Sequence, residues 1–146
     1  MKKNFLLSLA ITTGLVITGF ASNVNAGNVK DTAFEFYFSR TGGIAYSNNI
    51  RPKYDSTPTY FKFGWIKDGA GGYKVKVVDQ NGSGFSRTWW SRYFNDSVPS
   101  GTQSWISSYA YEDRGYGVKV KLHAEGGGGT GVWNSGGLWS PDSVRR

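Results

Sequence analysis

Large apolar side chains recur at every second position in several short segments of this chain, and this period constrains the fold more than any other feature. In 34–38, Phe34, Phe36 and Phe38 are separated by Glu35 and Tyr37. Successive side chains of a β-strand point to opposite faces, so the pattern predicts strands with one buried face. Similar alternation runs through 59–65, 73–77, 105–109 and 116–122. After residue 26, no sustained 3.6-residue apolar period predicts a helix.

Glycine-rich or proline-containing breaks separate these segments. Glycine adopts positive φ at little steric cost, so such breaks turn the chain back on itself. Short strands with turns about every 8 to 12 residues predict a single antiparallel β-sandwich or barrel-like domain, all-β in class. The breaks are 41–43, 68–72, 81–84, 99–101 and 126–129. We interpret the last of them, a run of four glycines, as a flexible connection.

A cationic strand pattern occurs twice in similar form, as YKVKV at 73–77 and as YGVKVKL at 116–122. We call these two copies the doubled strand. If both copies lie in one sheet, their tyrosines and valines face the core and their lysines share a solvent-facing surface. Lys62 and Arg114 would be its neighbours. The lysines concerned are Lys74, Lys76, Lys119 and Lys121.

These lysines have two interpretations. They either keep the sheet soluble and protect its edges from aggregation, or form a docking face for a polyanion. The expected partner in the second case is an anionic cell-wall polymer or a membrane surface, not nucleic acid. The formal net charge of +7 favours anionic surroundings without proving a partner.

The first 26 residues predict export. Lys2 and Lys3 precede a mostly apolar run, 5–20, and Ala26 ends a stretch of small residues suited to signal-peptidase cleavage. The apolar run is shorter than the roughly 20 residues that a membrane anchor needs. We therefore expect a signal peptide over 1–26 and one β-domain over 27–146. The protein would be secreted, either free or associated with the cell wall. With no cysteine, packing alone must stabilise it.

Residues suited to catalysis or metal binding are few. The stretch from Asp79 to Gly84 resembles the start of a calcium loop, but Trp90 stands at its twelfth position, where a carboxylate is required. Glu112 and Asp113 are adjacent, so on a strand they would point to opposite faces. His123 is the sole histidine, and its place on the polar face predicts a solvated side chain. We expect no enzyme activity, no metal and no cofactor.

Aromatic and basic residues crowd the segment 85–94. Trp89 and Trp90 are adjacent and cannot both face the core of a regular strand, so one is exposed or the segment is irregular. An exposed tryptophan beside Arg87 or Arg92 could stack on a sugar, a base or a lipid interface. The alternative is an aromatic plug that closes one end of the sandwich.

Two segments carry a resemblance to a known family. RPKYDST at 51–57 and GLWSPDS at 137–143 are similar to small exported proteins of Gram-positive bacteria that are classed as a domain of unknown function. The resemblance implies no particular activity. More distantly, the chain resembles lactococcin-like bacteriocins, which are exported, cysteine-free, glycine-rich β-proteins. It is longer than these and ends on Val144-Arg145-Arg146 instead of an aromatic residue.

The sequence is therefore compatible with two functions. The first is a secreted non-catalytic β-sandwich that binds anionic polymers of the cell wall or surface through its lysines. The second is a secreted bacteriocin-like antibacterial or membrane-active protein. A hydrolase is the least favoured, because the sequence places no nucleophile beside a base.

Overall fold

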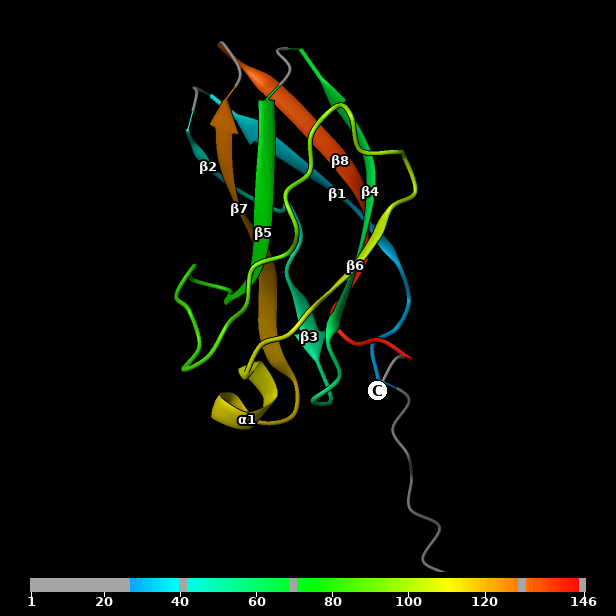
Figure 1. The fold of residues 1–146 in the computed structure, drawn as a ribbon. Helices are drawn as coiled ribbons and strands as arrows, with labels where there is room; N and C mark the ends of the chain where they lie inside the picture. Colours follow the sequence, from blue (N-terminus) through cyan, green and yellow to red (C-terminus); the bar gives the residue numbers. More distant parts are fainter. Residues whose placement is uncertain (1–26, 40–41, 69–70, 129–130, 145–146) are drawn as a thin grey trace, which may run out of the picture.

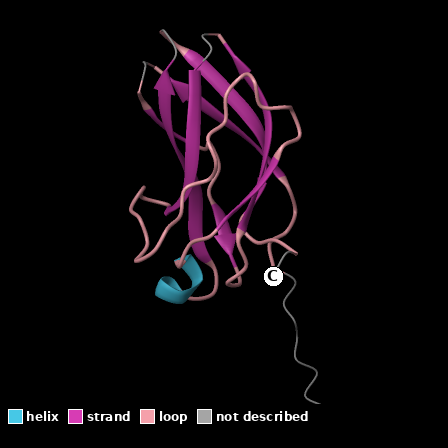
Figure 2. Ribbon diagram, viewed as in Figure 1, coloured by secondary structure: helices cyan, strands magenta, loops and turns pink. Residues whose placement is uncertain are grey.

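Two antiparallel β-sheets pack face to face in the computed structural model, which describes residues 27–39, 42–68, 71–128 and 131–144 (Figure 1, Figure 2). The predicted β-sandwich is confirmed, and within the described residues the sheets do not close into a barrel. The predicted signal peptide, 1–26, lies outside the described residues. No helix in the described part of the chain has the length and apolarity needed to cross a membrane.

Each sheet has four strands among the described residues. The first sheet has the order β1 (Thr32–Phe38), β8 (Trp133–Ser140), β4 (Thr59–Lys67), β6 (Gln103–Ile106). The second consists of β2 (Ile44–Tyr46), β3 (Arg51–Lys53), β5 (Gly71–Asp79) and β7 (Val118–Gly128). Its long strand β7 pairs with β5 along one edge, and with β2 and then β3 along the other.

The core between the sheets is unusually rich in aromatic rings. Phe36, Phe38 and Tyr73 are fully buried, and the ring of Phe38 stacks on Trp133 at a centroid distance of 3.9 Å. The Tyr73 hydroxyl is 2.8 Å from Ser135 Oγ, so its polar end is satisfied. Burial raises the pKa of Tyr73. Each such ring removes a large apolar area from water, which offsets the absence of disulfides.

Two predicted strand details are wrong. A register shift after Phe63 turns Trp65 away from the core. In β6 the buried residue is Ile106, and Trp105 is half-buried, opposite Tyr60. The chain then forms a short helix, α1 (Ala110–Arg114), which is too short to show an apolar period.

The second copy of the doubled strand begins later than predicted. β7 starts at Val118, so Tyr116 precedes the strand and is 60% exposed instead of facing the core. Its ring stacks on Tyr54, with centroids 4.7 Å apart. Val120 and Leu122 are buried as predicted.

The described glycines of the 126–129 run are part of a strand, so the prediction of a flexible connection is wrong for them. Gly126–Gly128 pair with the first residues of β5. A Cβ on Gly126 would lie 2.9 Å from Phe38 and 3.0 Å from Trp133, and a Cβ on Gly72 would overlap the Tyr93 ring. Gly72 and Gly126 therefore lack side chains because aromatic rings occupy that space.

Candidate functional site

The four lysines of the doubled strand lie in one sheet, as the repeat predicts. β5 and β7 are antiparallel neighbours (Figure 1). Lys76 lies opposite His123, and Val78 lies opposite Lys121. Alternate residues of a strand share a face, so the lysines project outward while Val75 and Val77 are buried. We call this surface the lysine face, and its members are Lys74, Lys76, Lys119 and Lys121.

The indole of Trp90 contacts two of these lysines. The Nζ atoms of Lys74 and Lys76 are 4.3 and 4.4 Å from its ring centroid. Segment 85–94 brings Trp90 there along the free edge of β5, where Ser91 N donates to Val75 O at 2.7 Å. Exposed cation–π contacts contribute about 0.5–1 kcal/mol each, so they restrain both ammonium groups without removing their charge.

The other half of the lysine face has a similar arrangement. Lys121 Nζ is 4.3 Å from the ring centroid of Tyr46, which β2 places beside β7. Among the described residues, Lys74 is the only one of the four lysines with a carboxylate partner within 4 Å, at 3.5 Å from Glu125 Oε2. Lys119, Arg114 and Asp79 line a shallow hollow of about 210 Å³. Positive charge therefore predominates on the lysine face.

Of the two predicted neighbours, Arg114 lies next to the lysine face and Lys62 does not. Arg114 lines the same hollow as Lys119. Lys62 belongs to β4 of the other sheet, so its predicted place is wrong. Sequence alone could not assign Lys62 to a sheet, because its strand has the same period as the others.

Arg87 and Trp89 form a separate cluster around Tyr109. The Arg87 guanidinium is 5.6 Å from the Tyr109 ring centroid, and the Trp89 centroid is 5.7 Å from it. Trp89 is 46% exposed and Trp90 is half-buried, which confirms that the two do not share a buried face. Arg92 is exposed. The plug interpretation holds for Phe94, which enters the core, and in part for Phe85, which packs against it.

His123 is buried, so the prediction of a solvated histidine is wrong. It is 6% exposed and lies between Tyr46 and Trp90, whose ring centroids are 5.1 and 5.8 Å away. Nε2 is 3.5 Å from Glu125 Oε1, at the outer limit of hydrogen bonding, and neither ring nitrogen has a well-formed hydrogen bond among the described residues. Burial lowers the pKa of His123 and nearby Lys76 lowers it further, against the opposite effect of Glu125.

Stability should consequently fall as the pH drops below about 6.5, the ordinary histidine pKa. The folded protein holds His123 neutral at a pH where the unfolded chain already binds the proton, so the unfolded state gains from acid. The fall is at most about 1.4 kcal/mol per pH unit for one proton. Urea denaturation at pH 7.5 and 5.5 measures it. His123→Phe, which keeps a ring and removes the titration, should reduce the difference, and an unchanged difference would contradict the assignment.

The two acidic motifs make local structural contacts. Asp79 Oδ1 accepts hydrogen bonds from the backbone N–H groups of Asn81 and Ser83 at 2.9 and 2.8 Å, which closes a turn. Asp113 lies on α1 and accepts hydrogen bonds from the backbone N–H and the hydroxyl of Ser86. Those hydrogen bonds lower its pKa. Among the described residues, no group of three or more His, Asp or Glu side chains could hold a metal.

An ion pair is buried where β3, the N-terminal segment and the end of β8 meet. Lys53 and Asp142 are both fully buried, with Nζ 3.0 Å from Oδ1. Lys53 also donates to Thr57 O and Pro141 O. Asp142 accepts from Asn28 N and Tyr54 N at 2.5 and 3.0 Å. With these additional hydrogen bonds, the pair meets the condition for burying charge without a large penalty.

The Lys53–Asp142 pair joins 51–57 to 137–143, the two segments that carry the resemblance found in the sequence. A family described as "Protein of unknown function (DUF2712)" matches residues 22–143. The chain belongs to this family. The match includes every strand of both sheets. No curated protein and no solved structure matches the chain.

Sequence reasoning did not find two members of the candidate site of this family member, Tyr46 and Glu125, and it did not predict that His123 is covered. Tyr46 reaches the lysine face only because β2 pairs with β7, and no local pattern indicates that pairing. Glu125 could have been found, since it continues the alternation of Lys121 and His123 along the same strand face. The covering of His123 depends on Trp90, which comes from another segment.

Proposed function

We propose that this protein is exported and binds an anionic polymer of the bacterial cell wall through the lysine face, without catalysing a reaction. The observation that carries the proposal is the gathering of four lysines on one open sheet face, opposed there by Glu125. Alternate residues of a strand are about 6.7 Å apart, so the ammonium groups form a row that a chain of regularly spaced anions can follow.

The aromatic contacts support binding over a purely solubilising role. A free lysine loses up to about 2 kcal/mol of side-chain entropy when it becomes ordered. Trp90 and Tyr46 already restrain three of the four ammonium groups at 4.3–4.4 Å. Less entropy then remains to be lost on binding, which raises the affinity of each contact.

The absence of catalysis and the export route are part of the proposal. The sole histidine is buried between rings, and Asp113 is engaged by Ser86, which supports a non-catalytic function. Gly27 follows the proposed cleavage point and packs against Asp55 and Asp142, so the mature chain would keep this contact. Export then places the lysine face where wall polymers occur.

Replacing Lys76, Lys119 and Lys121 by glutamine should weaken binding to teichoic-acid-bearing wall roughly hundredfold. A lysine near an anionic surface contributes about 1 kcal/mol, and about 1.4 kcal/mol is a factor of ten. Binding of the parent should fall steeply with salt. Protein purified from the medium of a Gram-positive host is titrated onto isolated wall, and its intact mass also reports removal of residues 1–26.

The matched control is Lys30→Gln/Lys62→Gln/Lys67→Gln, which removes the same charge from outside the second sheet. It should bind within about threefold of the parent, since it leaves the lysine face intact. Equal losses in both triple variants would show a general charge effect and overturn the site. Equal binding to wall stripped of teichoic acid would overturn the proposal that an anionic polymer is the ligand. Leakage of anionic vesicles without wall binding would also overturn it and would support a membrane-active protein.

A further inference from the structure

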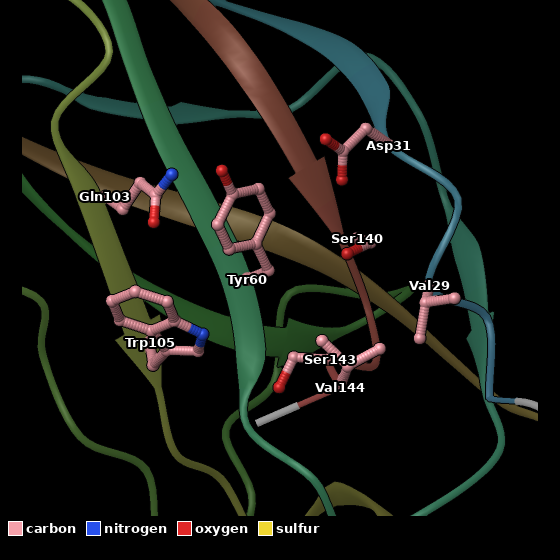
Figure 3. Close-up of a pocket in the computed structure, with 8 residues that line it drawn as sticks. All are labelled: Val29, Asp31, Tyr60, Gln103, Trp105, Ser140, Ser143 and Val144. Carbon is pink, nitrogen blue, oxygen red and sulfur yellow. The ribbon is translucent and has the colours of Figure 1, made fainter. Parts of the chain in front are cut away.

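The outer face of the other sheet contains a separate hollow. Its volume is about 340 Å³, within the range of small-molecule sites. Figure 3 shows the Tyr60 ring at its centre, with Trp105 and Gln103 to one side and Asp31 and Ser140 to the other. The lining consists of Val29, Asp31, Tyr60, Gln103, Trp105, Ser140, Ser143 and Val144.

The sheet builds this hollow from one row of residues across its strands. Tyr60 of β4 pairs with Trp105 of β6 on one side and with Ser140 of β8 on the other. Asp31 directly precedes β1, whose first residue pairs with the neighbour of Ser140. Adjacent strands are about 4.8 Å apart, so the row spans roughly the width of one or two sugar rings.

The two aromatic rings form an open corner. The centroids of Tyr60 and Trp105 are 6.0 Å apart, and their planes are inclined by 59°. Val29 and Val144 add apolar surface at the other end of the hollow. Inclined rings of this kind present an apolar wall to a flat ligand whose faces carry C–H groups.

The hollow has polar groups at its rim. Asp31 and Gln103 are exposed and offer a carboxylate and an amide. Burial raises the pKa of Tyr60, and the negative charge of Asp31 raises it further. Apart from Asp31, the polar side chains that line the hollow are uncharged: Tyr60, Gln103, Ser140 and Ser143. The lining therefore consists mainly of neutral hydrogen-bonding groups, which suit the hydroxyl groups of a neutral ligand.

We propose that this hollow binds a neutral pyranose, with Tyr60 and Trp105 against its C–H face and Asp31 and Gln103 at its hydroxyl groups. An apolar wall beside a polar rim is the complement of a sugar ring, which has apolar faces and polar edges. This site is independent of the lysine face, which belongs to the other sheet. It gives the protein a means of binding uncharged glycan.

The test uses two neutral probes, cellotetraose and the tetramer of N-acetylglucosamine. Isothermal titration and saturation-transfer NMR with the purified protein should show binding of at least one, with a Kd on the order of 0.1–1 mM. Trp105→Ala should weaken it at least about tenfold, since aromatic stacking supplies most of the contact. Asp31→Asn, at an exposed position, should fold normally and weaken binding about threefold or more.

Two controls separate this site from the rest of the protein. Tyr37→Ala removes a 63% exposed ring of the first sheet that does not line the hollow, and it should bind as the parent does. The Lys76→Gln/Lys119→Gln/Lys121→Gln variant should also bind normally, and salt should have little effect. The proposal is overturned if neither saccharide binds, if choline binds instead, or if Tyr37→Ala or the lysine variant loses saccharide as Trp105→Ala does.

Discussion

Replacing Asp142 by asparagine is expected to lower the free energy of unfolding by about 3–5 kcal/mol. The change leaves the Lys53 ammonium buried with carbonyl partners but without its counter-charge. It also turns an amide NH₂ toward N–H groups, because Asp142 accepts from Asn28 N and Tyr54 N. An uncompensated buried charge and opposed donors both favour the unfolded chain. Urea denaturation measures the loss.

A second substitution tests whether the loss of stability comes from the unpaired charge of Lys53. Lys53→Met in the Asp142→Asn background removes the unpaired ammonium, so the double variant should be less destabilised than the sum of the single changes, with a coupling of about 0.5–3 kcal/mol. Asp96→Asn, at an exposed carboxylate, should change stability by less than about 0.5 kcal/mol. Strict additivity of Lys53→Met and Asp142→Asn would contradict the ion-pair argument.

Replacing Gly137 by alanine is expected to cost about 3 kcal/mol, at the upper end of the range for overpacking. A Cβ on Gly137 would overlap the backbone carbonyl oxygen of Lys62 and would lie 3.0 Å from Gly64 N. Backbone in the middle of a sheet cannot move aside as a flexible side chain can. Thermal and urea unfolding measure the effect, and protein yield should fall with it.

Gly127→Ala is the matched control for Gly137→Ala. Gly127 is also in a strand, but its Cβ would be 3.5 Å from the Tyr93 hydroxyl, an ordinary contact. Stability should therefore change by less than about 1 kcal/mol. If both variants unfold alike, glycine itself, and not the close approach of β4 to β8, is what these strands require.

The pattern of apolar residues was enough to predict the fold class and much of the core. Phe34, Phe36 and Phe38 alternate with exposed residues in β1 as the period-two pattern predicted. The doubled strand likewise predicted a shared lysine-bearing face, because alternation is a local property of extended backbone. The two family segments, 51–57 and 137–143, were also recognisable in the sequence. The sequence did not indicate that these segments bury Lys53 against Asp142.

Tertiary structure alone decided which groups surround the lysines and where the charges pair. Trp90 reaches Lys74 and Lys76 through an irregular segment along β5, and Tyr46 reaches Lys121 through the β2–β7 pairing. Those contacts bury His123, which its own strand pattern placed in solvent. Alternation of apolar and polar residues predicts which face of a strand a residue occupies. What covers that face depends on strand order and register, which are set by contacts between residues far apart in the chain.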